Sequence, residues 1–527
     1  MTDLNTVPEV STSPTGPTSP SVAPGVPALD LDEIQGDVLL GLQKFFERFL
    51  FFQINDVKAF KAALASEIAP RVTTTTMVCA RELELQLRSF NRHAHRDRHD
   101  SPSEAVLPNV GLNVGFTQSG IQKLVPGANL NEASFAAGAA ARAGALGDPL
   151  NGHTPANWIP AFLAGTLDGV FLITGGTEDA VNGEAAALLG ILGSAATVAY
   201  DETGNVRPGT NKGHEHFGWQ DGISQPGVTG LTTPSPGQRL IDAGRFVFGY
   251  PGQPGGTAST TSPTPALPPA IPPALPWMAN GSFMVFRRLQ QLVPEFNQFL
   301  LDQAASLGMD PVLLGARLVG RWKSGAPLAL TPAQDDTALG QDSHENNNFD
   351  FADDQAQRRC PFGAHIRKTN PRQDLAPQES RVDPRRIIRA GIPFGPEVTD
   401  DEQASGKTLE QRGLMFVCYQ TSIANQFEFL QVSWANNPGF VFGKTHQDGT
   451  PVAVGWDPII GQNGGQNGTQ NSASGQNRVR TMDEPVPNYP AGNVRSTLRE
   501  PQDFVVATGG AYFFVPSISA LKNELST

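Results

Sequence analysis

The sequence predicts an α+β fold made of two ferredoxin-like units, each with the element order βαββαβ. Three observations support this class. The chain has 527 residues, which is more than one modest hydrophobic core needs and therefore favours two domains. Short apolar segments typical of strands alternate with segments that have the spacing of amphipathic helices. The order of these segments in the first half recurs in the second half, without clear sequence identity.

The first half contains one complete βαββαβ pattern. Residues 56–68 have helical spacing, because Val57, Phe60 and Ile68 fall on one face. Residues 110–116 alternate as a strand does. The predicted elements are a strand at 48–54, a helix at 56–68, a strand at 110–116, a short helix at 119–124, a strand at 169–174, a helix at 178–192 and a strand at 198–201.

The second half repeats this order with fewer recognisable elements. The helix expected at 424–435 carries Phe427, Leu430 and Trp434. The predicted elements are a strand at 282–287, a helix at 293–307, a strand at 414–420, a helix at 424–435 and a late strand at 504–515.

These patterns divide the chain into a disordered N-terminal tail at 1–28, an N-terminal domain at 29–230 and a C-terminal domain at 231–527. The tail is rich in Pro, Ser and Thr and has no apolar stretch of the kind found in a secretory signal. An extracellular and a cytoplasmic location therefore both stay open. Segments 251–276 (Pro, Ser, Thr) and 461–478 (Gly, Gln, Asn) are predicted to be loop insertions in the C-terminal domain.

The composition favours a globular enzyme over a nucleic-acid or membrane protein. The formal net charge is −13, from 38 basic and 51 acidic residues, which argues against nucleic acid or anionic membrane as the main partner. No apolar run approaches the roughly 18 residues of a membrane span. The three cysteines, Cys79, Cys360 and Cys418, show no CxxC spacing and are interpreted as small buried hydrophobic residues.

His365 is the histidine that the sequence singles out. It lies in residues 360–372, which read CPFGAHIRKTNPR. A single histidine in a basic segment bounded by prolines suits an axial ligand of haem iron, and the basic residues are then available to the porphyrin propionates. The alternative is a structural histidine that is solvated or hydrogen-bonded.

Asp221 lies in a second unusual segment, residues 216–226, which read HFGWQDGISQP. An Asp-Gly pair alone indicates no more than a turn. In a Gly-rich loop, with an arginine supplied from elsewhere in the chain, the carboxylate suits the splitting of peroxide on haem iron.

Together these segments resemble the dye-decolorising (DyP-type) haem peroxidases, especially their fungal-like branch. The resemblance implies a haem b cofactor, held mainly by the C-terminal half, with His365 as the iron ligand on the proximal face. Asp457, in VGWDPIIGQ at 454–462, matches the aspartate that orients this histidine, with an Asp-Pro turn as the alternative. Arg367 matches an arginine near a haem propionate, with a surface arginine as the alternative.

The resemblance also implies which residues face the distal, peroxide-binding side. Asp221 matches the aspartate of the family's GxxDG signature. Arg389, in IIRAGIPFGPE at 387–397, matches the distal arginine, although a surface basic cluster is the alternative. Phe416 matches a phenylalanine of the distal wall, with ordinary strand core as the alternative.

Bulky donors would not enter such a pocket and would need an electron route from the surface. Trp434 matches a surface tryptophan that serves this purpose in relatives, and the alternative is a tryptophan packed within its helix. Phe394 departs from the family pattern, because a tyrosine stands there in some members. The loss of that phenol puts one electron route in doubt.

The sequence therefore predicts a peroxidase that reduces H₂O₂ and oxidises dyes, phenols and other aromatic donors, through Asp221 and Arg389. Because an aspartate ionises near a pKa of about 3.9, the activity optimum is expected to be acidic. Two alternatives stay open. The acidic run at 342–354 offers oxygen ligands for a peroxidase that oxidises Mn²⁺, whereas a haem-binding protein without turnover would need only His365. The oligomeric state is not predicted.

Overall fold

The computed structural model describes residues 28–94, 109–253, 274–375, 382–445, 451–452, 454–462, 478–483 and 495–527. The predicted tail up to residue 27, and most of the predicted insertions at 251–276 and 461–478, lie outside the described residues. Those three assignments therefore stay predictions.

The first half forms a four-stranded antiparallel sheet. Its strands are β1 (Phe46–Ile54), β2 (Gly111–Phe116), β5 (Gly169–Gly175) and β6 (Ala196–Asn205). Their order in the sheet is β6-β1-β5-β2. With the strands numbered one to four along the chain, this order is 4-1-3-2, which two interleaved βαβ connections produce.

The second half forms a sheet of the same topology. Its strands are β9 (Ser282–Gln291), β11 (Ile392–Phe394), β12 (Gly413–Gln420) and β15 (Val505–Val515). Their order is β15-β9-β12-β11, again 4-1-3-2. The α+β class and the repeated ferredoxin-like order are therefore confirmed.

The two sheets join into one closed barrel. β15 pairs with β2 at Phe514 and Phe116, and β11 pairs with β6 at Phe394 and Gly204. β10 (Ile388–Arg389) lies on the same side of β12 as β11 and pairs with the C-terminal end of β12. The two units thus share one continuous sheet, and the boundary predicted at residue 230 stays a prediction.

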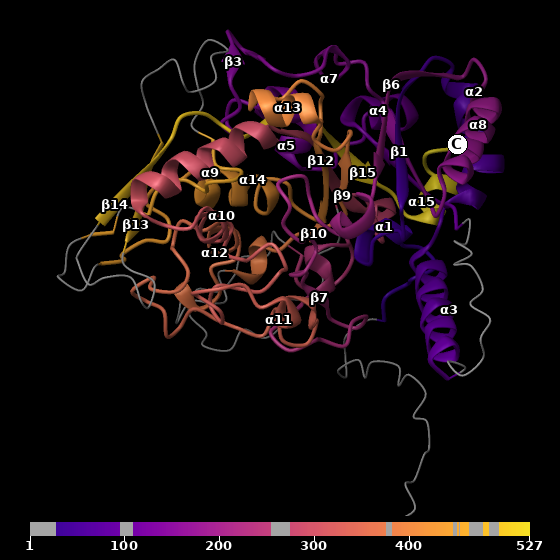
Figure 1. The fold of residues 1–527 in the computed structure, drawn as a ribbon. Helices are drawn as coiled ribbons and strands as arrows, with labels where there is room; N and C mark the ends of the chain where they lie inside the picture. The colour runs from indigo at the N-terminus through magenta and orange to yellow at the C-terminus, as the bar shows by residue number, and fades with distance from the viewer. Residues whose placement is uncertain are drawn as a thin grey trace, which may run out of the picture.

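Helices cover the barrel on separate sides (Figure 1). α2 (Val57–Ala63), α8 (Glu178–Leu192) and α15 (Ile518–Lys522) gather on one side, and α9 (Val293–Leu307), α10 (Pro311–Val319), α12 (His365–Thr369) and α14 (Phe427–Phe429) on the other. The remaining α-helices are α1 (Gly36–Leu39), α3 (Thr75–Ala94), α4 (Gln118–Leu124), α5 (Ala133–Ala137), α6 (Ala139–Arg142), α7 (Pro160–Leu163), α11 (Thr337–Gln341) and α13 (Asp400–Ser405). The remaining strands are β3 (Leu150–Asn151), β4 (Thr154–Pro155), β7 (Gly227–Val228), β8 (Leu240–Ile241), β13 (Arg478–Asp483) and β14 (Arg495–Glu500).

Several elements differ from their predicted form. The helix predicted at 56–68 is α-helical only to Ala63 and continues as a π-helical turn at Leu64–Ile68. The helix predicted at 424–435 begins at Phe427 and is π-helical over Leu430–Ala435. Helix α3 and strands β10 and β11 were not predicted. Across the described residues, no helix has the length and apolar character that crossing a bilayer requires.

Aromatic side chains fill the barrel. The side chains of β12 alternate between the barrel interior and a cavity on the other face of the strand. The ring of Phe51 lies 5.0 Å from that of Phe286 and 6.2 Å from that of Phe513. On β12, Met415 is fully buried and contacts the β6 side, whereas its neighbours Leu414 and Phe416 line the cavity described below. This alternation follows from the two-residue period of a strand.

The seam at Gly204 provides a test of the barrel closure. A Cβ atom at this position would lie 2.5 Å from Met415 Cε and 2.8 Å from the carbonyl oxygen of Pro393. We expect Gly204→Val to lower the free energy of unfolding by about 1–3 kcal/mol through overpacking, as measured by chemical denaturation. The matched control is Gly183→Ala in α8, where the added Cβ would meet no atom within 4 Å outside its own helix turn. This variant is expected to raise the free energy of unfolding by about 0.5–1 kcal/mol. Equal stability of the Gly204→Val variant and the parent would contradict the tight seam.

Candidate active site

A cavity lies between the β9–β12 face of the barrel, helix α12 and the loop at 215–226. It encloses about 1650 Å³ of empty space, part of which is open to solvent. His365, Asp221, Arg389 and Phe416 all line it, so the structure brings together residues that are far apart in the sequence. Its wall combines apolar side chains with a few convergent titratable groups, which is the usual composition of a cofactor or substrate pocket.

A buried carboxylate orients the imidazole of His365. His365 is the first residue of α12, and its Nδ1 lies 2.8 Å from Oδ2 of Asp457. The other carboxylate oxygen of Asp457 accepts hydrogen bonds from the backbone N–H groups of Ile459 (2.8 Å) and Ile460 (3.0 Å). Among the described residues, His365 Nε2 has no hydrogen-bond partner, so it is available as a ligand atom toward the cavity.

The His365–Asp457 pair is also favoured electrostatically. Burial alone would lower the pKa of His365, but the carboxylate of Asp457 outweighs burial and raises it. Burial alone would raise the pKa of Asp457, but His365 and the two backbone donors lower it below its usual value. The aspartate is therefore ionised, and the Nδ1–H group donates to it.

Asp221 and Arg389 form an ion pair in the same cavity. Arg389 Nη1 donates to Asp221 Oδ1 at 2.9 Å, and the backbone N–H of Gly222 donates to the same oxygen at 2.6 Å. The side chains are 39% and 31% exposed, and both belong to the cavity wall. Burial would raise the pKa of Asp221, but Arg389 and Gly222 more than offset it, and the pKa is lowered. The carboxylate is thus held ionised as an acceptor.

Apolar side chains make up much of the remaining wall. Phe416 faces the cavity as expected, and its ring lies 6.0 Å from that of Phe427. Further apolar lining residues include Leu289, Val319, Ile366, Leu414, Leu430, Ile459, Ile460 and Val505. Such walls suit a flat apolar ring system and exclude water from it.

Two family models match most of the chain. One, described as the DyP dimeric alpha+beta barrel domain, matches residues 33–208, and the other, described as Dyp-type peroxidase, C-terminal, matches residues 252–440. The chain is 42% identical to the dye-decolorizing peroxidase of Mycena epipterygia over 513 residues, which cover 94% of this chain and 87% of the relative.

The chain belongs to the dye-decolorising peroxidase family.

Solved structures agree with this assignment. An ancestral D-type dye-decolorizing peroxidase has 42% sequence identity and a TM-score of 0.78, and the match covers 95% of this chain and 100% of that one. A dye-decolorizing peroxidase in complex with 2,6-dimethoxyphenol has 39% identity, a TM-score of 0.75 and the same coverage. The chain is therefore a haem peroxidase of the DyP type, an oxidoreductase from a family that oxidises dyes and phenols. The predicted family, enzyme class and fold class are confirmed.

The residues present fit a haem. Besides His365 and the apolar walls, three arginines line the cavity: Arg321, which is buried, and Arg372 and Arg386, which are partly buried. Burial lowers their pKa values to about 10, 9 and 10, and none forms an ion pair within the part of the chain that the structure describes. The Nε atom of Arg386 is buried without a hydrogen-bond partner. Buried cations without carboxylates are costly, so this cluster favours an anionic ligand such as the haem propionates.

Sequence reasoning missed this arginine cluster. Arg372 belongs to the basic segment 360–372 that the sequence associates with the propionates, but no pattern singles it out, and Arg386 lies in the basic stretch before Arg389 whose alternative is a surface cluster. The structure marks Arg372 by its positive φ of 45°, which few non-glycine residues adopt and which the sequence does not reveal.

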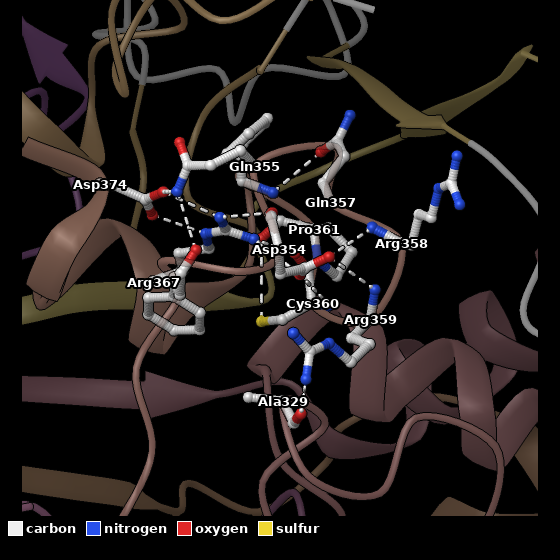
Figure 2. A network of polar contacts seen from close by, with 12 residues as sticks. Ala329, Asp354, Gln355, Gln357, Arg358, Arg359, Cys360, Pro361, Arg367 and Asp374 are labelled. Carbon is white, nitrogen blue, oxygen red and sulfur yellow. Dashed lines mark hydrogen bonds and ion pairs between the residues drawn. The ribbon is translucent and has the colours of Figure 1, made fainter. Parts of the chain in front are cut away.

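Arg367, in contrast, does not reach the cavity. Its five N–H groups meet five acceptors on Asp354, Asp374 and the carbonyl of Cys360, at 2.5–3.1 Å (Figure 2). Its guanidinium also lies 4.4 Å from the ring of Phe351 and 4.3 Å from that of Phe362. The alternative of a surface arginine is wrong, because Arg367 is fully buried. That it lies near a haem propionate stays a prediction, and all five of its N–H groups are already engaged within the protein. Its guanidinium links the chain on both sides of His365.

Trp434 is buried rather than at the surface. It is 4% exposed and stacks on Phe440, with ring centroids 4.9 Å apart and planes 6° apart. Phe440 in turn contacts Phe442 at 5.4 Å, and Phe442 is 61% exposed. The prediction of a surface tryptophan is wrong, and the packed alternative holds. Phe394 is also buried, beneath the guanidinium of Arg288 at 4.1 Å.

The acidic run does not converge on one point. Asp342 and Asp350 accept from the backbone N–H groups of His344 (2.9 Å) and Ala352 (2.8 Å). Asp353 pairs with Arg359, and Asp354 faces Arg367. The remaining member of the run is Glu345. Within the described ranges, no group of three or more His, Cys, Asp or Glu residues could hold a metal ion.

The Arg367 network predicts a large stability effect. Arg367→Met leaves Asp354 and Asp374 buried with too little positive charge, because within the described residues the other cation paired with either carboxylate is Lys444, 3.3 Å from Asp374. We expect the free energy of unfolding to fall by about 3–5 kcal/mol in urea titrations. The matched control is Arg359→Met, which removes an exposed pair with Asp353 and should cost less than about 1 kcal/mol. Similar losses in both variants would contradict this account.

Proposed function

We propose that this chain binds haem b through His365, reduces H₂O₂ at the Asp221–Arg389 pair, and oxidises aromatic donors of the dye and phenol type. The observation that carries the proposal is the ion pair between Asp221 and Arg389 at 2.9 Å, in the same cavity as the histidine that Asp457 orients. When bound, haem supplies a redox-active iron that takes up the oxidising equivalents of peroxide.

The proximal residues hold the cofactor and set its electronic character. His365 presents Nε2, while the Nδ1–H bond to the ionised Asp457 gives the ring a more basic, imidazolate-like character. Arg372 and Arg386 would hold the two propionates, since their buried charges lack carboxylate partners among the described residues.

Asp221 and Arg389 divide the work on peroxide between them. Asp221 is ionised and can accept the proton from one peroxide oxygen and deliver it to the other, which leaves as water. The guanidinium of Arg389 stabilises the negative charge that develops as the O–O bond breaks. Neither residue could do the work of the other, because the carboxylate moves a proton and the guanidinium does not.

The chemical class of the donor rests on relatives. The dye-decolorizing peroxidase of Mycena epipterygia is named for dyes, and a similar structure is a complex with 2,6-dimethoxyphenol. We extend both donor classes to this chain. The two alternatives have less support: a haem-binding protein without turnover has no use for Asp221 and Arg389, and the carboxylates proposed for Mn²⁺ are engaged separately.

Removal of the carboxylate tests the assignment. Asp221→Asn keeps the size of the side chain but abolishes proton acceptance, so we expect the rate of peroxide-dependent dye oxidation to fall by about 10²–10⁴-fold with haem content unchanged. The rate is measured by stopped-flow absorption at known haem loading. Asp302→Asn, on the exposed side of α9, is the matched control and should keep full activity. A dye oxidised as fast by Asp221→Asn as by the parent would rule out Asp221 as the proton acceptor.

The pH dependence tests the role of Arg389. In the parent, the lowered pKa of Asp221 keeps the carboxylate ionised in mildly acidic solution, so activity should persist there. Arg389→Leu removes the main group that opposes burial, so the pKa of Asp221 rises and the acid limb of the pH–rate profile moves to higher pH. Arg71→Met, which removes an exposed arginine paired with Glu184, should leave the limb in place. A limb that stays in place, or moves to lower pH, in Arg389→Leu would overturn this electrostatic assignment.

A further inference from the structure

Arg389 lies in an edge strand with one side unpaired. β10 pairs with β12 through Ile388 opposite Tyr419 and Arg389 opposite Cys418. The next residue, Ala390, donates its N–H to the carbonyl oxygen of Val417 at 2.9 Å. In an antiparallel ladder only alternate residues bond to the partner strand, so the N–H and C=O groups of Arg389 point to the opposite side. Within the described sheet, no strand pairs with β10 on that side.

One side-chain amide occupies that open side. Gln225 Nε2 donates to the carbonyl oxygen of Arg389 at 2.6 Å, and the N–H of Arg389 donates to Gln225 Oε1 at 3.2 Å. A primary amide holds a donor and an acceptor in one plane, so Gln225 presents the pair of groups that a neighbouring strand would present. The side chain therefore satisfies both backbone groups of Arg389 at once.

Gln225 belongs to the same loop as Asp221. The loop is fixed near this point, because Gln238 Nε2 donates to the carbonyl oxygen of Gln225 at 3.1 Å. Arg389 Nη2 donates to the carbonyl oxygen of Ser224 at 3.2 Å. Asp221 and Ser224 thus bind the guanidinium of Arg389, whereas Gln225 binds its backbone and sets where the side chain starts.

We propose that Gln225 is a positioning residue that holds Arg389 at the distance from Asp221 that peroxide cleavage requires. This inference rests on the proposed function, since it concerns the same ion pair. Gln225 itself contacts the backbone of Arg389 and acts on peroxide only through the placement of the guanidinium. A shift of about 1 Å in such a group can cost about 10²-fold in rate.

Substitutions that remove the amide of Gln225 but keep the length of its side chain test this role. Gln225→Glu keeps the shape but replaces the NH₂ donor with an oxygen that faces the carbonyl of Arg389, so the paired contact is broken. Gln225→Met keeps the length with no polar groups and serves as the second variant if Gln225→Glu folds poorly. Gln298→Glu, on the exposed face of α9, is the matched control for the charge change.

Three measurements on the haem-loaded proteins separate positioning from general damage. We expect both Gln225 variants to react with H₂O₂ about 10- to 100-fold more slowly in stopped flow, at equal haem content and thermal midpoint. The acid limb of their pH–rate profiles should move to higher pH, since Asp221 loses part of its contact with Arg389. A crystal structure of Gln225→Glu should show Arg389 Nη1 and Asp221 Oδ1 farther apart than the 2.9 Å of the parent.

The remaining outcomes distinguish a failure of the Gln225 inference from a failure of the proposed function. A peroxide rate within two-fold of the parent, or a lower rate with the acid limb and the Arg389–Asp221 distance unchanged, would overturn the role of Gln225. If the parent protein with haem bound does not react with H₂O₂, the proposed function fails instead. A failure of the inference is thus observed in the Gln225 variants, whereas a failure of the proposed function is observed in the parent protein.

Discussion

The ion pair between Asp221 and Arg389 is the contact on which the rest of the site depends, because it joins the two halves of the chain. Asp221 lies in the loop that follows the first ferredoxin-like unit, and Arg389 lies in the second unit, on β10. The barrel seam between β11 and β6 is only five residues beyond Arg389, at Phe394. The pairing that closes the sheet therefore also sets how the two halves of the peroxide site meet.

Buried arginines serve two distinct purposes in this protein. Arg367 and Arg412 are fully buried against carboxylates, Arg412 with Glu402 at 2.5 Å, and their charges are neutralised within the fold. Arg321 is buried and Arg372 and Arg386 are partly buried, yet none of the three pairs with a carboxylate within the described residues. Arg321 donates to the carbonyl oxygen of Gly325 and Arg372 to the side-chain oxygen of Asn347, whereas Arg386 Nε has no hydrogen-bond partner. Arg367 thereby stabilises the segment that carries His365, and Arg412 links residues 396–402 to β12. The second kind creates a positive region suited to an anionic ligand. The partner, rather than burial alone, separates structural arginines from ligand-binding ones.

Local patterns predicted most of the framework, and long-range contacts account for what they missed. Helices 178–192 and 293–307 have the predicted bounds. The first is rich in Ala and Leu, which favour helix, and the second has amphipathic spacing. Strand β11 was missed because it has three residues and contains Pro393, and a barrel seam depends on pairing between distant segments. His365, Asp221, Arg389, Asp457 and Phe416 lie in or beside the cavity, as their motifs indicated. The burial of Arg367 and Trp434 was not predicted, because it depends on how the chain folds back, with Asp354 and Asp374 around Arg367 and Phe440 stacked on Trp434.

The position of β15 near the C-terminus has a consequence for biosynthesis. This strand completes the second sheet against β9 and joins it to β2, so one edge of each of these two strands stays unpaired until residues 505–515 leave the ribosome. During translation the first unit therefore carries two open sheet edges, on β2 and β6. Unpaired edges of this kind readily join other chains, so the nascent protein depends on rapid completion or on chaperones to avoid aggregation.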